Sequence, residues 1–258
     1  MAQPQTIAGV ERALDVLNLF ADEGVTDLGV TEVAEKLDLS KAVVHRILSS
    51  FTAKEYVELD DDTRRYRLGP RILTLGLSYL DRMDVRDIAR DALRELVDRT
   101  TETATLSVRH GWNRVYVDQV TPARDIKMVV QLGSSHPLHA GGSSKAFLAF
   151  LPDEMQEAYV SSDNLTKVTD RTVTSPKKLR AELAEIRDRG YAVSLGERQA
   201  GAGSVAAPLF GYDGTPVAVI SVCGPVERFE AEVDDCAKHL LDVTRRVSSQ
   251  LGYRERSA

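Results

Sequence analysis

A short amphipathic helix that follows a two-residue turn places the strongest constraint on this chain. Ser40 stands where the N-cap of this helix is expected, and Asp38 and Leu39 form the turn in front of it. A second, shorter helix is predicted before the turn, with Thr31 as its N-cap. The apolar residues after Ser40 recur at helical spacing and form one stripe: Val43, Val44, Ile47, Leu48 and Phe51. Two helices joined by so short a turn predict a helix-turn-helix.

The opposite face of the longer helix indicates what it binds. If the apolar stripe packs into a core, this face is presented to solvent. It carries small, basic and hydrogen-bonding side chains: Lys41, Ala42, His45, Arg46 and Ser49. Such side chains bond base edges and phosphates in the major groove of double-stranded DNA, and we expect Arg46 and His45 to read bases while Lys41 contacts phosphate. The alternative is a solvated basic face with no partner.

A wing is predicted after the second helix of the motif. Residues 56–59 and 66–68 are typical of short strands, and the three aspartates at 60–62 suit the turn between them. Arg64 and Arg65, near the tip of this hairpin, are expected to contact the DNA backbone or a minor groove.

The charge of the chain argues against a nucleic-acid partner, but its distribution does not. The net charge is −6, and residues 1–75 contain 9 basic and 13 acidic side chains. DNA-binding domains normally carry an excess of basic residues. Residues 40–54 and 63–71, however, contain basic residues and no carboxylate. The basic charge is therefore gathered into the two segments that a winged helix lays on DNA.

Length and composition predict two folded domains without a membrane segment. A chain of 258 residues is long for one ordinary core. No apolar run approaches the roughly 18 residues of a membrane span, and the N-terminus lacks a secretory pattern. Only two cysteines occur, Cys223 and Cys236, and we expect both to be reduced and at least partly buried. These features favour a cytoplasmic protein without a membrane partner.

The rest of the chain predicts a linker and an α+β domain. A helix that starts at Pro70 is apolar around its circumference, which favours packing against a partner subunit: Ile72, Leu73, Leu75, Leu77, Tyr79 and Leu80. After it, strands are expected at 103–109, around Val115 and Val117, and at 126–132, 191–195, 204–209 and 216–223. Helices are expected at 85–99, 143–151, 176–189 and 230–251. This order predicts an antiparallel sheet with helices against it.

Several segments together resemble the IclR family of bacterial regulators. They are LSKAVVHRILSSF, YRLGPRILTLG, LGSSHPLHAGGSSKAFLAF, GYAVSLGERQAGAGSVAAPLFGYDG and AVISVCGP. The sequence departs from the family pattern in having Ser194 where an aspartate is frequent, and Gly211 where an acidic residue usually follows the aromatic Phe210. The resemblance covers nearly the whole chain.

This resemblance implies a fold, a partner and a site. Residues 1–70 would form a winged helix-turn-helix, 71–84 a linker helix that dimerises, and 85–258 a GAF-like effector-binding domain. The protein would bind operator DNA as a homodimer or a dimer of dimers, with repression more expected than activation. By position in the motifs, the small-molecule effector pocket maps onto Met128, His136, Gly142, Ser143, Ser194, Ala202, Ser204, Ser221 and Cys223.

The residues themselves favour an acidic effector. Gly141, Gly142 and Ser143 precede a predicted helix, whose free N–H groups and dipole attract an anion. The alternative is that the glycines only turn the chain. No arginine or lysine is evidently placed to pair with a carboxylate, so the helix terminus and hydroxyls are expected to bind it. A small organic or aromatic acid of a catabolic pathway fits this pattern.

The sequence motifs that would indicate an enzyme or a cofactor site are less complete than those of a DNA-binding regulator. Gly201, Gly203 and Ala206 spell GxGxxA, but Pro208 follows within a strand-like run, so no helix opens there for a dinucleotide. The segment at 141–145 lacks the second glycine of a nucleophile elbow. His136 and His139 are a weak metal signal because no carboxylate pair lies near them. We therefore expect no catalytic residue, no metal and no cofactor; the main rival is a sensor or protein-interaction module without a ligand.

Overall fold

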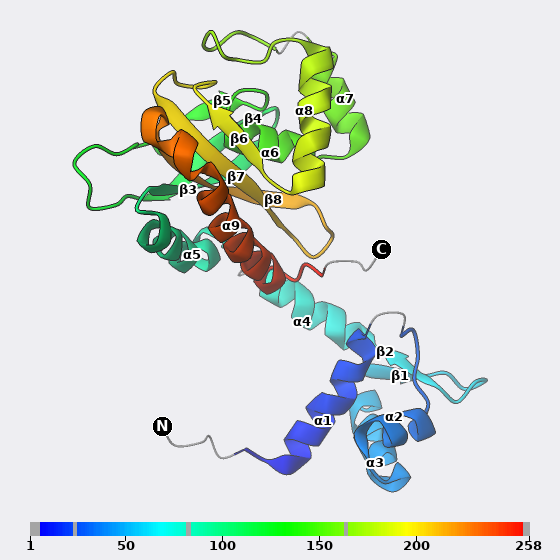
Figure 1. Ribbon diagram of the computed structural model, residues 1–258. Coiled ribbons are helices and arrows are strands. Elements are labelled where there is room, and N and C mark those ends of the chain that lie inside the picture. The colour runs from blue at the N-terminus through cyan, green and yellow to red at the C-terminus, as the bar shows by residue number, and fades with distance from the viewer. Residues whose placement is uncertain (1–5, 23–24, 81–83, 163–164, 255–258) are drawn as a thin grey trace. The chain divides into compact units, whose positions relative to one another are not determined.

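The computed structural model describes residues 6–22, 25–80, 84–162 and 165–254 (Figure 1). The chain divides into two compact units, Met1–Met83 and Asp84–Ala258. Among the described residues, no helix is long and apolar enough to cross a membrane. The fold is a mixture of helices and antiparallel strands, with the helix-turn-helix in the first unit and the larger sheet in the second.

The first unit is a winged helix-turn-helix. Its elements are α1 (Ala8–Asn18), a 3-10 turn (Leu19–Ala21), α2 (Val30–Leu37), α3 (Lys41–Thr52), β1 (Val57–Leu59), β2 (Tyr66–Leu68) and α4 (Pro70–Leu80). Asp38 adopts a left-handed conformation with φ of 52°, which ends α2 and directs the chain into α3. Ser40 caps α3 as predicted, because its hydroxyl accepts a hydrogen bond from the Val43 N–H at 3.3 Å. The predicted motif is therefore confirmed.

The start of α2 differs from the prediction. Thr31 lies inside the helix, and Gly29 is the N-cap. The physical reason is a β-bridge: the N–H and C=O of Leu28 pair with Tyr66 of the wing, so the helix begins directly after the bridge, and Gly29 C=O accepts from Val33.

The core of this unit is formed by the stripe predicted on α3 together with residues of the other helices and the wing. Val44 and Leu48 are fully buried against Val16, Leu28 and Val33. Burial of several aliphatic side chains of this size stabilises a small unit by roughly 1.5–3 kcal/mol each. The outer face of α3 is consequently fixed by what its inner face buries.

Helix α4 begins at Pro70 as predicted and presents apolar side chains to solvent. Leu73 is 65% exposed and Leu75 is 47% exposed. The side chains of Leu77, Tyr79 and Leu80 lie outside what the structure describes. Packing of α4 against a partner subunit stays a prediction.

The second unit is a six-stranded antiparallel sheet with helices on both faces. Its elements are α5 (Val85–Thr100), β3 (Thr103–His110), β4 (Asn113–Val120), β5 (Ser135–Pro137), α6 (Gly142–Ala149), α7 (Asp153–Val160), α8 (Pro176–Arg189), β6 (Ala192–Leu195), β7 (Ala202–Phe210), β8 (Pro216–Pro225) and α9 (Val226–Gln250). The strand order is β5-β4-β3-β8-β7-β6, and all pairs are antiparallel. The predicted α+β architecture is confirmed.

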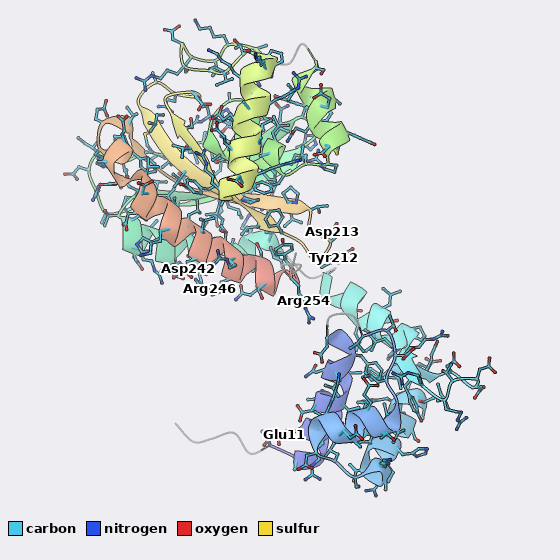
Figure 2. The ribbon with its side chains drawn as sticks, turned by 45° about the vertical axis from the view of Figure 1, so that its right-hand side comes forward. Glu11, Tyr212, Asp213, Asp242, Arg246 and Arg254 are labelled. Carbon is cyan, nitrogen blue, oxygen red and sulfur yellow. The ribbon has the colours of Figure 1, made fainter. Side chains whose placement is uncertain are left out.

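The alternation of side chains along β7 shows which helices cover which face. A Cβ on Gly203 would meet the ring of Phe229 in α9, whereas Gly142 of α6 lies against Ser204 and Ala206. Successive residues of a strand point to opposite faces, so α9 and α6 lie on opposite sides of the sheet. Helix α5 packs beside α9, and ion pairs join them: Arg99 to Asp242 at 3.3 Å, and Arg246 to Glu95. Figure 2 labels Asp242 and Arg246 on α9.

One predicted strand is wrong. Residues 126–132 form an irregular segment, and the short strand β5 follows it at Ser135–Pro137. The backbone of the segment is bound by side chains in place of a neighbouring strand. The Gln119 amide donates to Val130 C=O at 2.8 Å and accepts from Val130 N–H at 3.0 Å, and Thr103 Oγ1 donates to Met128 C=O at 2.6 Å. Apolar residues that suggested a strand, such as Ile126, are exposed here.

Candidate nucleic-acid interface and ligand cavity

The outer face of α3 is open to solvent as the sequence predicts. Five side chains from the predicted DNA face are exposed: Lys41, Ala42, His45, Arg46 and Ser49. Among the described residues, no carboxylate lies within ion-pair distance of Lys41 or Arg46. His45 Nδ1 lies 3.4 Å from Ser49 Oγ. The face therefore offers two unpaired cations beside uncharged donors and acceptors.

The two predicted wing arginines have different surroundings. Arg64 is the more open of the two: its side chain is 70% exposed and its Nη1 lies 3.6 Å from Asp61. Arg65 is bound by two carboxylates, with its Nε donating to Asp27 and its Nη2 to Glu32 at 2.9 Å. These hydrogen bonds raise the pKa of Arg65. Its charge therefore serves first to hold the wing against α2, which leaves Arg64 as the freer cation at the hairpin.

The predicted effector residues gather around a small cavity in the second unit. The cavity has a volume of about 20 Å³ and its lining is Arg114, Tyr116, Met128, Gly141, Gly142, Ser143, Ser194, Arg198, Gln199, Ala202, Gly203, Ser204, Ser221 and Cys223. All of the nine predicted residues except His136 belong to this lining. The structure thus brings together segments that lie more than 90 residues apart in the sequence.

Close packing around the first turn of α6 shapes one wall of the cavity. Gly141 has a φ of 95°, which favours glycine, and its N–H donates to Glu197 Oε2 at 3.4 Å. A Cβ on Gly142 would lie 2.9 Å from Ser204 Oγ, so this position also requires a residue without a side chain. The first N–H groups of a helix have no partner within the helix, and Gly142 and Ser143 at the start of α6 line the cavity.

His136 lies behind the lining. Its ring packs edge-on against the Tyr116 ring with centroids 5.5 Å apart, and its Nε2 lies 3.1 Å from Ser134 Oγ. Burial, and then the charges of Arg114 and Arg198, lower the pKa of His136 to about 4. His136 therefore lies outside the lining and supports Tyr116 as a neutral ring, and its role in effector binding stays a prediction.

Two arginines line the cavity, and the expectation that none would be placed there is wrong. Arg114 of β4 is 1% exposed and donates three hydrogen bonds to hydroxyls: Nε to Ser144 at 2.8 Å, Nη1 to Ser107 at 3.2 Å and Nη2 to Tyr116 at 2.9 Å. Burial lowers the pKa of Arg114. The Arg198 guanidinium lies 5.7 Å from the centroid of the Tyr116 ring. The wall is thus more basic than the sequence motifs indicate.

A buried ion pair fixes the loop that carries Arg198. Lys145 of α6 is fully buried, and its Nζ donates to Glu182 and, at 2.5 Å, to Glu197 Oε1. Burial raises the pKa of Glu197, and Lys145 opposes this shift. Glu197 also accepts from the Gly141 N–H, so one carboxylate joins the loop to the start of α6. The two walls of the cavity are therefore held together.

The residues considered above for a cofactor or metal site have structural roles. Gly201, Gly203 and Ala206 lie at or along β7, which continues as a strand to Phe210, so the arrangement of a dinucleotide motif is missing. His139 Nδ1 lies 2.9 Å from the Tyr159 hydroxyl and its Nε2 lies 2.8 Å from Thr166 O. In the described part of the chain, no three His, Cys, Asp or Glu side chains form a group suited to a metal ion.

A winged helix-turn-helix and an α+β unit that contains a small polar cavity, in one chain, are typical of the class of DNA-binding transcription regulators. Two family models match this chain: the IclR helix-turn-helix domain over residues 9–61 and the bacterial transcriptional regulator IclR C-terminal domain over residues 77–249. The chain belongs to the IclR family. It is a DNA-binding transcriptional regulator, and the family is not one of enzymes.

Relatives support this assignment along the whole chain. The HTH-type transcriptional regulator BhcR of Paracoccus denitrificans is 33% identical over 251 residues, which cover 96% of this chain and 89% of that protein. The crystal structure of a putative IclR regulator from Silicibacter sp. TM1040 is similar, with a TM-score of 0.84, 27% identity and coverage of 96% and 97%. An IclR homolog from Microbacterium hydrocarbonoxydans, solved in complex with 4-hydroxybenzoate, has a similar fold, with a TM-score of 0.59, 23% identity and coverage of 95% and 99%.

Proposed function

We propose that this regulator represses a catabolic operon and that an organic or aromatic acid, bound in the cavity of the second unit, changes its affinity for operator DNA. The observation that carries the proposal is the cavity lining, which joins the first turn of α6 to hydroxyls and arginines. A helix N-terminus with convergent polar donors suits a carboxylate. The 4-hydroxybenzoate complex of the Microbacterium relative supports an acid of this size as ligand.

DNA recognition is assigned to the exposed face of α3. Arg46 and His45 would contact base edges, with Lys41, Ala42 and Ser49 beside them, and Arg64 and Arg65 would contact the backbone from the wing. A homodimer, or a dimer of dimers, would place two such helices in successive major grooves. The proposed division is 1–70 for DNA binding, 71–84 for the linker and 85–258 for effector binding. A protein that acts on the chromosome would lie in the cytoplasm.

Ligand entry requires the cavity to enlarge. About 20 Å³ is room for about one water molecule, whereas an acid of several carbons needs more. Met128 lies in the irregular segment before β5, and Arg198 lies in the loop before β7. The backbone of neither residue is therefore part of a strand. A ligand that binds the enlarged form more tightly shifts the population toward it. That shift is the proposed source of the change in DNA affinity.

The DNA assignment is tested with Arg46→Ala in a gel shift on DNA upstream of the gene. Loss of a bidentate base contact costs about 1–3 kcal/mol, so we expect roughly 5- to 150-fold weaker binding. Arg94→Ala is the matched control. Arg94 of α5 is 57% exposed, and its substitution removes the same charge from the second unit. If Arg46→Ala binds as tightly as Arg94→Ala at moderate salt, Arg46 does not belong to the interface.

The effector assignment is tested by repeating the gel shift with a panel of catabolic acids. A change in operator affinity supports an effector-controlled regulator. A folded protein whose operator affinity none of the acids changes would support the rival, a regulator or interaction module without an acid ligand. The direction of the change distinguishes release from DNA, as expected for an induced repressor, from tighter binding.

A further inference from the structure

Arg114 is a buried charge without a counter-charge. Its side chain is 1% exposed, and in the described part of the chain no carboxylate lies within ion-pair distance of its guanidinium. Its only bonded partners there are three neutral hydroxyls, and the guanidinium lies 4.1 Å from the centroid of the Tyr116 ring. Buried charges are ordinarily paired, because desolvation is costly. A cation left in this state favours an anionic ligand.

The strand that carries Arg114 is turned with its polar residues inward. In β4, Arg114, Tyr116 and Asp118 are buried, whereas Val115 and Val117 are only half-buried. A strand chosen for stability alone would bury the valines. Residues that break such a local rule are typical of functional sites. The orientation of β4 therefore indicates that Arg114 is placed at the cavity for binding.

Two positive groups lie near Arg114. Its Nε bonds to Ser144 in the first turn of α6, so the positive end of the helix dipole adds to its charge. Arg198 lines the same cavity, and no Asp or Glu belongs to the lining. Glu197, the acid beside Arg198, is engaged by Lys145 and by the Gly141 N–H. The cavity therefore presents two guanidiniums and no anion.

The guanidinium has donors left for a ligand. An arginine has five N–H groups, and each of the two terminal nitrogens carries two. The hydrogen bonds of Nη1 and Nη2 to Ser107 and Tyr116 use one N–H on each. One donor on each terminal nitrogen therefore remains for a ligand.

We propose that Arg114 is the carboxylate receptor of this regulator, with Arg198 closing over the bound acid, so that the effector must be an anion and its neutral analogues are excluded. This inference rests on the proposed function, since it assumes that the cavity takes the effector. It adds the residue that selects the ligand class. A carboxylate would give Arg114 the counter-charge that none of the described carboxylates supplies.

The experiment measures binding of paired probes to the full-length protein by calorimetry and thermal unfolding, at constant ionic strength. Each carboxylate is matched with its neutral amide: formate with formamide, pyruvate with pyruvamide, and 4-hydroxybenzoate with 4-hydroxybenzamide. Formate is included because it is the smallest carboxylate and therefore requires the least enlargement of the cavity. We expect at least one acid to bind and its amide to bind at least about 100-fold more weakly, because the amide leaves the buried charge unpaired.

Two substitutions separate a binding role from a structural one. Arg114→Met is expected to abolish acid binding and to leave the unfolding temperature equal to or above that of the wild type, because it removes a buried charge at similar volume. Arg114→Lys keeps the charge without the fork, so an intermediate affinity is expected. Arg180 is paired with Glu157 on the surface, so Arg180→Met serves as the control and is expected to leave acid binding unchanged.

Every outcome decides the inference. Selective binding of acids, lost in Arg114→Met, supports it. Equal binding of an acid and its amide overturns the role of Arg114 but leaves the proposed control by an effector intact. A neutral effector that changes operator affinity has the same two consequences. Absence of binding by every carboxylate, formate included, overturns it. An Arg114→Met protein that unfolds well below the Arg180→Met control also overturns it, since Arg114 would then be a structural residue.

Discussion

Replacing Lys145 with methionine removes a buried cation from between two carboxylates. The Lys145 side chain is fully buried, that of Glu197 is 10% exposed and that of Glu182 is 24% exposed. Methionine fills a similar volume, so the change leaves two acids that face each other without a counter-charge. Removing one partner of a buried ion pair costs about 3–5 kcal/mol, because the remaining charge stays desolvated. We expect Lys145→Met to lower the free energy of unfolding by this amount near neutral pH.

The loss should depend on pH in a defined direction. Burial raises the pKa of Glu197 above its ordinary value of 4.5, and without Lys145 this pKa rises further. A carboxyl whose pKa is higher in the folded state than in the unfolded state favours folding when it is protonated. Its contribution is fully present below the unfolded pKa and is lost as the pH rises through the folded pKa. The deficit of the variant should therefore be largest at about pH 7.5 and should shrink toward about pH 5.

Urea unfolding of the full-length protein, followed by circular dichroism at both pH values, measures this deficit. Lys167→Met is the matched control, because Lys167 is 63% exposed and pairs with Asp170, which is 96% exposed. An exposed pair of this kind contributes less than about 1 kcal/mol. A Lys145→Met protein that is no less stable than Lys167→Met, or whose deficit is the same at both pH values, would show that Lys145 does not stabilise the two buried acids.

Two further predictions concern packing and cysteine reactivity. Gly203→Ala should destabilise the protein by about 1–3 kcal/mol in thermal unfolding, because its Cβ would lie 2.8 Å from Phe229 Cδ1, while Gly201→Ala, which meets nothing within 4 Å, should be neutral. Equal unfolding temperatures for the two variants would contradict this. Cys223 and Cys236 should react with Ellman's reagent only after unfolding, since burial raises the pKa of each thiol to about 12. Rapid release of thionitrobenzoate from the native protein would be inconsistent with their burial.

Helix caps and apolar periodicity correctly predicted those elements whose ends and buried faces depend on short stretches of sequence. Helix α8 lies at Pro176–Arg189 as predicted, because Ser175 caps it and Gly190, with φ of 85°, ends it. The stripe and cap of α3 likewise decide its boundaries and its outer face. Such features depend on neighbours within a few residues.

Other features depend on contacts between distant segments, and sequence periodicity does not reveal them. Residues 126–132 have the composition of a strand, but the side chain of Gln119 binds the backbone there. Helix α7, Asp153–Val160, was not predicted, although Pro152 and two acidic residues in its first turn are a signal that was available. Its short length and few buried residues make the pattern weak.

The arginines of the cavity could not be assigned from the family motifs, because neither position stood out in the matched segments. Arg114 lies in a strand in which Val115 and Val117 draw attention as the apolar face. The structure shows the opposite orientation, with Arg114 and Tyr116 inside. In a short strand that alternates charged and aromatic residues with valines, either the valines or the other residues can face the core. Tertiary packing decides which face is buried.

We propose that this chain couples the face of α3 to an acid bound at the cavity of the second unit. Fluorescence anisotropy of labelled upstream DNA, titrated with the full-length protein, tests it most directly when repeated with a saturating concentration of the acid that binds best in calorimetry. We expect at least a tenfold change in the operator dissociation constant, which corresponds to about 1.4 kcal/mol. The same dissociation constant with and without the bound acid would contradict it.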